Sequence, residues 1–194
     1  MILIIQRHAE RLKNTGEASG DGPLTTSGRA QAEMQAQLME IQLKRRFVTQ
    51  IDYAIVSGSI RCAETFAETW RHLLTAGIRI SDYTMAKEYF STVEEDKSWA
   101  KLFVPPQYEK FMTAQKAVGE RQATLDFAGT LVEACVKRTV NAIKSAVMES
   151  RKQVILVVTH EPHAALIVER FTGTDQQILE LGHFAVIDVP YTYT

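Results

Sequence analysis

Two histidines and two arginines occupy corresponding places in the sequence, close behind short apolar segments. Arg7 and His8 directly follow the first of these segments. His160 comes just after the most apolar one, and Arg61 lies a few residues beyond another. Guanidinium groups can hold phosphoryl oxygens through paired hydrogen bonds. One imidazole can attack phosphorus while a second donates a hydrogen bond to an equatorial oxygen. Brought together, the four side chains would form a pocket for a phosphate dianion.

The apolar segments are the elements that must position these side chains. Residues 2–6, 51–56 and 154–158 are rich in β-branched residues and predict buried strands. Apolar residues at helical spacing predict helices over residues 28–46, 60–76, 123–149 and 162–171. Alternating strands and helices predict an α/β fold, a three-layer α/β/α sandwich with a mostly parallel central sheet. Ligands bind beyond the carboxyl ends of strands in such sheets, where the four side chains would meet.

The rest of the chain completes a single domain over residues 1–194. Further strands are expected at residues 78–80, 178–181 and 183–189. The irregular, polar character that begins at Ser81 indicates a small inserted lid region, to which we assign residues 81–122.

Helical spacing also predicts which side chains face the core. The predicted buried stripe of the first helix is Ala30, Met34, Leu38 and Ile41. In the second helix it is Ala63, Phe66, Ala67, Trp70 and Leu74. In the long third helix it is Val132, Val136, Val140, Ile143 and Val147, with Cys135 beside it.

Composition narrows the class of protein. The 194 residues include 22 Lys plus Arg against 23 Asp plus Glu, a net charge of −1, which argues against a nucleic-acid binder that works by bulk charge. No apolar run approaches the length needed to span a membrane. Cys62 and Cys135 lie far apart and form neither a disulfide framework nor a zinc-binding pattern. We therefore expect a cytoplasmic globular protein that binds neither nucleic acid nor membrane.

Five motifs occur in an order that resembles the histidine phosphatase superfamily, which includes the cofactor-dependent phosphoglycerate mutases. RHAE at residues 7–10 resembles the RHG signature of that family, and residues 24–32 resemble its LTxxGxxQA segment. Residues 57–65 resemble its SSxxRAxxT segment, the TH pair at residues 159–160 its second histidine, and residues 182–186 its closing strand.

The resemblance implies a role for each of the chemical residues. His8 would be the nucleophile and would pass through a phosphohistidine, while Arg7, Arg61 and His160 would complete the phosphate pocket. Glu88, which follows the third strand, would be the general acid that protonates the leaving oxygen. These roles agree with the chemistry, because neutral imidazole is a good nucleophile near pH 7 and a poor alkoxide leaving group needs a proton. Neither a metal nor another cofactor is expected, since the arginines would neutralise the phosphate charge.

The sequence departs from the family pattern near the second histidine. Glu161 follows His160 where mutases usually carry glycine, which makes it a rival to Glu88 as proton donor or a residue of the binding pocket. Arg11 matches the RHGxR of acid phosphatases, whereas Asn14 matches the asparagine found in mutases and bisphosphatases. Both are candidate phosphate contacts, and together they leave the subfamily open.

These observations predict a metal-independent phosphatase that hydrolyses a small phosphomonoester through a phosphohistidine. The alternatives are a mutase-type phosphotransferase, a phosphoprotein or phosphohistidine phosphatase, and a non-catalytic phosphate-binding module. A homodimer is left open as well.

Overall fold

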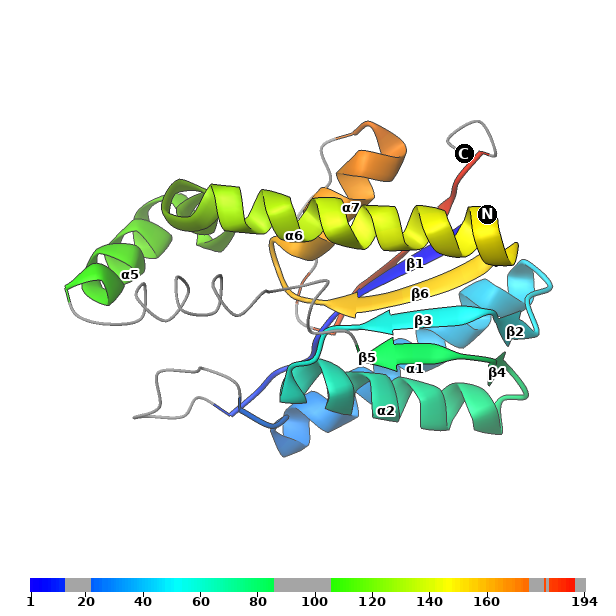
Figure 1. Cartoon of the computed structure of the whole chain (residues 1–194). Helices are drawn as coiled ribbons and strands as arrows, with labels where there is room; N and C mark the ends of the chain where they lie inside the picture. Colours follow the sequence, from blue (N-terminus) through cyan, green and yellow to red (C-terminus); the bar gives the residue numbers. More distant parts are fainter. Residues whose placement is uncertain (13–21, 86–105, 175–179, 181, 191–194) are drawn as a thin grey trace.

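The central sheet confirms the predicted architecture. The structure, a computed structural model, describes residues 1–12, 22–85, 106–174, 180 and 182–190. Its main sheet has five strands in the order β5-β3-β6-β1-β7 (Figure 1). The strands are β1 (Ile2–Arg7), β3 (Tyr53–Val56), β5 (Tyr83–Met85), β6 (Val154–Thr159) and β7 (Phe184–Asp188). All neighbours pair in parallel except β1 and β7, which are antiparallel.

Helices cover both faces of this sheet (Figure 1). The helices α1 (Thr26–Arg45) and α2 (Ile60–Thr75) pack on one face, where Ile4 of β1 lies in their core cluster. The helices α6 (Glu120–Ser150) and α7 (His163–Thr172) pack on the other, where Leu3 and Ile5 point. Successive side chains of a strand therefore point into the cores on opposite faces of the sheet, which explains why β1 and β6 are apolar throughout.

The region around the second predicted strand differs from the expectation. Residues 51–56 do not form one strand: β2 (Gln50–Ile51) ends before Asp52, and β3 begins after it. The Asp52 carboxylate accepts hydrogen bonds from the backbone N–H groups of Gln153 and Val154. These bonds hold Asp52 at the break between the two strands. The strand predicted near residue 79 exists as β4 (Arg79–Ile80), but it pairs with β2 in a separate two-stranded sheet.

Two elements lie in segments where no regular structure was predicted. β5 falls in the stretch expected to be irregular, yet it forms the edge of the main sheet beside β3. A helix, α5 (Gln107–Val118), precedes α6, which begins at Glu120. Phe111 of α5 packs edge-to-face on Phe127 of α6, with ring centroids 5.8 Å apart. The lid role of residues 81–122 stays a prediction. The strand predicted at residues 178–181 falls mostly outside the described residues.

The predicted core face of α1 is wrong. Met34, Leu38 and Ile41 are 52%, 47% and 46% exposed, and Ala30 is exposed as well. The buried face is instead formed by Gly28, Ala32, Gln35, Ala36, Met39 and Leu43. Both faces carry apolar residues at helical spacing, so periodicity alone selects neither.

The faces of the other helices are closer to the prediction. In α2, Phe66 is buried as expected, but Ala67 and Leu74 are exposed. The fully buried face instead includes Thr65, Thr69 and Leu73. The stripe predicted for α6 packs against the core, together with Cys135. None of the helices in the described part of the chain is long and apolar enough to cross a membrane.

Candidate active site

The register of the parallel strands brings the predicted residues to one edge of the sheet. Arg7, the last residue of β1, lies beside Thr159, the last residue of β6. The backbone N–H of His8 then donates to the Thr159 carbonyl at 2.9 Å. The N–H of Ser57, which follows β3, donates to the Val158 carbonyl at 2.9 Å. The three strand ends therefore place His8, Ser57 and His160 next to one another.

The ring of His160 is held by two side chains from the start of α2 and the turn before it. The Arg61 Nε–H donates to His160 Nδ1 at 3.2 Å, and the Ser57 hydroxyl lies 2.8 Å from His160 Nε2. Since a guanidinium can only donate, Nδ1 must be unprotonated and Nε2 carries the hydrogen. Burial, followed by the positive charge of Arg61, holds the pKa of His160 well below its ordinary value. His160 is therefore a neutral hydrogen-bond donor in the free protein.

The ring of His8 is fixed through its Nδ1 atom. His8 Nδ1 lies 2.8 Å from the Ala9 carbonyl, which can only accept, so Nδ1 carries the hydrogen and Nε2 keeps its lone pair. Burial, and then the positive charge of Arg61, lowers the pKa of His8 to about 3. The rings of His8 and His160 stand edge-on with centroids 5.3 Å apart. A neutral imidazole with a free Nε2 beside a second neutral imidazole is suited to nucleophilic attack on a bound electrophile.

Arginine charges surround this pair. The pKa of His8 is lowered, after the effects of burial and Arg61, by the nearby charges of Arg7 and Arg11. Arg7 is only 8% exposed, while Arg11 is partly exposed and forms a β-bridge with Leu24. The charges that disfavour a protonated His8 favour a dianion, so the site is electrostatically suited to a phosphoryl group.

Thr65 of α2 anchors the residue that orients His8. The fully buried Thr65 hydroxyl accepts a hydrogen bond from the Ala9 N–H at 3.0 Å and donates to the Arg61 carbonyl at 2.7 Å. One turn further along α2, the buried Thr69 hydroxyl exchanges hydrogen bonds with the Gln6 side chain. Thr65 closes the SSxxRAxxT-like segment, whereas Thr69 lies outside the motifs.

The start of α1 holds the chain just beyond His8. The Glu10 carbonyl accepts a hydrogen bond from the Thr25 N–H, and the Glu10 N–H donates to Gln31 Oε1. Thr25 also caps the helix by accepting from the Gly28 N–H. Gly28 lies so close that a Cβ there would stand 2.0 Å from the Glu10 carbonyl oxygen. This contact explains why the LTxxGxxQA-like segment needs glycine at that position.

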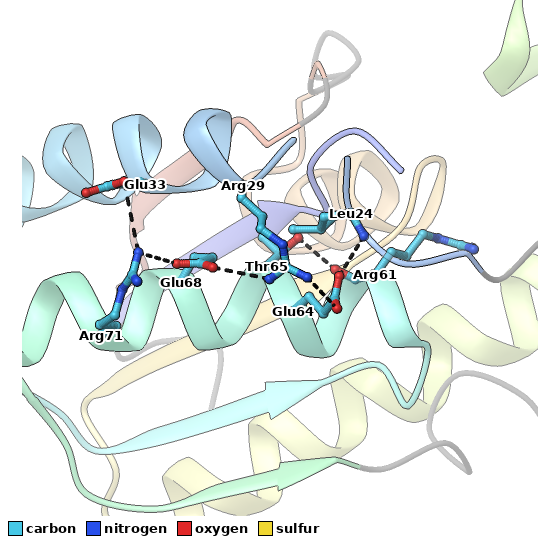
Figure 2. A network of polar contacts seen from close by, with 8 residues as sticks. All are labelled: Leu24, Arg29, Glu33, Arg61, Glu64, Thr65, Glu68 and Arg71. Carbon is cyan, nitrogen blue, oxygen red and sulfur yellow. Dashed lines mark hydrogen bonds and ion pairs between the residues drawn. The ribbon is translucent and has the colours of Figure 1, made fainter. Parts of the chain in front are cut away.

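A charged network ties α1 to α2 beside the site (Figure 2). Glu64 accepts from the Leu24 N–H at 2.6 Å and from Arg29 at 2.7 Å. Arg29 also reaches Glu68 at 3.3 Å, and Glu68 pairs with Arg71 at 2.5 Å. The network fixes the entry of α1 relative to the helix that carries Arg61 and Thr65.

A second buried histidine lies behind His160. His163, the first residue of α7, is 6% exposed, and its ring centroid is 6.2 Å from that of His160. Neither of its ring nitrogens has a hydrogen-bond partner within the described ranges. Burial, and then the charges of Arg138 and Arg61, lowers its pKa to about 4. Nothing in the local sequence marks the place of His163 beside the pocket.

Of the three remaining candidate site residues, one is buried and two lie outside the described residues. Glu161 is 8% exposed, and solvent does not reach its carboxylate oxygens. Glu88 and Asn14 lie outside the described residues. Within the part of the chain that the structure describes, no three His, Cys, Asp or Glu side chains are grouped so that they could hold a metal ion.

The same strands, helices and motifs define a known family. The profile of the histidine phosphatase superfamily (branch 1) matches residues 3–189. The chain belongs to the histidine phosphatase superfamily. A comparison with curated proteins finds no match.

Solved structures of other superfamily members share the fold. The protein histidine phosphatase SixA, complexed with tungstate, is 17% identical, with 96% of this chain and 94% of that chain covered and a TM-score of 0.55. Phosphoglycerate mutase from Bacillus anthracis is 16% identical, with 97% and 92% covered and a TM-score of 0.59. Mycobacterial glucosyl-3-phosphoglycerate phosphatase, in complex with VO3, is 12% identical, with 96% and 90% covered and a TM-score of 0.60.

Proposed function

We propose that this histidine phosphatase hydrolyses a small phosphomonoester through a phosphohistidine on His8. The observation that carries the proposal is the free Nε2 of a neutral His8, held 5.3 Å (ring centroids) from His160 among the charges of Arg7, Arg11 and Arg61. The family membership and the phosphatases among its structural neighbours support it.

The proposed reaction has two steps. His8 Nε2 attacks phosphorus, the bond from phosphorus to the leaving oxygen breaks, and that oxygen takes a proton from a carboxylic acid. Water then attacks the phosphohistidine, returns its proton to the carboxylate and releases phosphate with neutral His8. In this reaction Arg61 turns from His160 Nδ1 to the phosphoryl oxygens, and His160 Nε2–H moves from Ser57 to the same group.

We propose Glu88 as the acid and assign Glu161 to the wall of the pocket. Glu161 is almost fully buried just before α7, between the partly buried His160 and the buried His163. The acid matters for a basic alkoxide leaving group and little for nitrophenolate. Glu88→Gln should therefore impair alkyl phosphates selectively while sparing p-nitrophenyl phosphate, and Glu161→Gln should not show this split. A selective defect in Glu161→Gln alone would reverse the assignment.

A panel of phosphorylated metabolites, a phosphohistidine-bearing protein and a mutase assay tests the activity itself, with EDTA present throughout. We expect turnover of at least one small phosphomonoester, abolished in Arg61→Ala because the dianion loses a bidentate partner. Faster turnover of the phosphohistidine protein would shift the substrate class to proteins. Phosphate binding with no turnover of any substrate would favour a binding module.

A further inference from the structure

The outer side of α1 carries an apolar stripe that the fold leaves uncovered. Met34, Leu38 and Ile41 are each about half exposed, and the exposed Ala30 extends the stripe toward the start of the helix. The core-facing side of α1 is a different set of residues, including Met39 and Leu43, which are fully buried. Among the described residues, the stripe is therefore not part of the core.

The stripe has the geometry of a helix-packing seam. Met34, Leu38 and Ile41 are separated by four and then three residues, the spacing of a coiled-coil seam. From Ala30 to Ile41 the stripe is about 16 Å long at 1.5 Å per residue. Gln37, which is also exposed, lies on the same side near its middle.

We propose that a second copy of the chain packs on this stripe, with the two α1 helices antiparallel about a twofold axis beside Gln37. This register sets Met34 of each copy against Ile41 of the other and brings the two Leu38 side chains together at the centre. A patch used by both copies must be self-complementary, as this one is. The two Gln37 amides meet at the axis, where a polar pair fixes register.

The charges on α1 favour the antiparallel arrangement. Glu33 lies near the beginning of the stripe, with its side chain 50% exposed and its nearest cation, Arg71, at 4.0 Å. Arg45 is exposed at the far end, on the same side of the helix as Leu38. In the antiparallel register each Arg45 reaches toward Glu33 of the other copy, whereas a parallel pair would set like charges together. The helix dipoles also oppose one another in this arrangement.

The size of the patch sets the strength of the contact. A helix face about 16 Å long and about 10 Å wide is well below the roughly 800 Å² per partner of a standard interface. We therefore expect a weak dimer, with a dissociation constant of tens of micromolar or higher. The stripe runs along the outside of α1 and contains none of the pocket residues, so both monomer and dimer should be active.

Sedimentation equilibrium from about 5 to 500 µM tests the proposal. The wild-type protein should shift from monomer toward dimer over this range, and Leu38→Glu should remain monomeric throughout. Met148→Glu is the matched control, because Met148 is 64% exposed on α6, across the sheet from α1. A wild-type protein that stays monomeric at 500 µM would overturn the proposal and assign the stripe to a different protein. Equal dissociation by Met148→Glu, or a dimer insensitive to Leu38→Glu, would overturn it too.

Cysteine cross-linking tests the orientation. The native Cys62 and Cys135 are buried, so an introduced surface cysteine is the one exposed to oxidant among the described residues. Gln37→Cys should form a disulfide-linked dimer under mild oxidation, because the two side chains meet at the axis. Ala30→Cys should not, since the antiparallel register separates its two copies by about 22 Å along the helix. Cross-linking of both variants would indicate parallel helices, and cross-linking of Ala30→Cys alone would exclude the proposed register.

Discussion

Replacement of Thr65 by valine tests how α2 positions the nucleophile. Valine keeps the shape of threonine but cannot accept the hydrogen bond from the Ala9 N–H, a 3.0 Å contact in a fully buried place. A buried donor left without a partner costs about 1–3 kcal/mol. Because the Ala9 carbonyl orients His8 Nδ1, the same change should loosen the nucleophile. We expect urea unfolding to show that loss of stability and kcat to fall about tenfold or more, the equivalent of about 1.4 kcal/mol.

Thr69→Val is the matched control. Thr69 lies one turn further along the same helix, is equally buried and exchanges two hydrogen bonds with Gln6, at 3.1 and 3.2 Å. Its replacement should destabilise the fold by a similar amount, since it leaves a buried amide unsatisfied. It should spare kcat, because the hydrogen bond that orients the His8 ring comes from the Ala9 carbonyl and does not involve Gln6. Wild-type kcat in a destabilised Thr65→Val protein, or an equal loss of kcat in Thr69→Val, would refute this reasoning.

Three further predictions follow from individual contacts. Gly28→Ala should destabilise the fold by about 1–3 kcal/mol in thermal or urea unfolding, because its Cβ would overlap the Glu10 carbonyl, whereas Gly129→Ala, with open space around it, should be neutral or stabilising. The pKa of His163 is lowered to about 4, so the unfolded chain takes up its proton first and stability is lost as the pH falls from about 6.5 to 4. Between pH 7 and pH 4.5, the free energy of unfolding measured in urea should therefore fall by about 2 kcal/mol less for His163→Leu than for wild type. An unchanged pH dependence would contradict this. Ser57→Ala removes the 2.8 Å partner of His160 Nε2 and should lower kcat about tenfold and the free energy of unfolding by about 1 kcal/mol.

The sequence was sufficient to predict the layers and the residues at the strand ends. Continuous apolar runs identified β1 and β6, and the topology of parallel sheets then implied that Arg7, His8 and His160 share an edge. Those inferences depend only on local composition and chain order.

The predictions that were wrong concern features that depend on contacts between distant segments. α1 has two apolar faces, and only its packing on α2 and the sheet decides that Met39, rather than Met34, is buried. The break at Asp52 follows from backbone groups a hundred residues away. The roles of Thr65 and His163 likewise arise from tertiary contacts. Thr65 closes the SSxxRAxxT-like segment, but the segment does not tell which groups its hydroxyl binds, and no motif marks His163.

Trapping of the covalent intermediate tests the central claim most directly. The protein is mixed with a radiolabelled phosphomonoester that it turns over, quenched in alkali within the first turnovers, digested and analysed by mass spectrometry. The account predicts a phosphoryl group on His8 that is stable in base and labile in acid, and that is absent from His8→Asn although this variant still binds phosphate. A label on another residue, or undiminished turnover in His8→Asn, would contradict it.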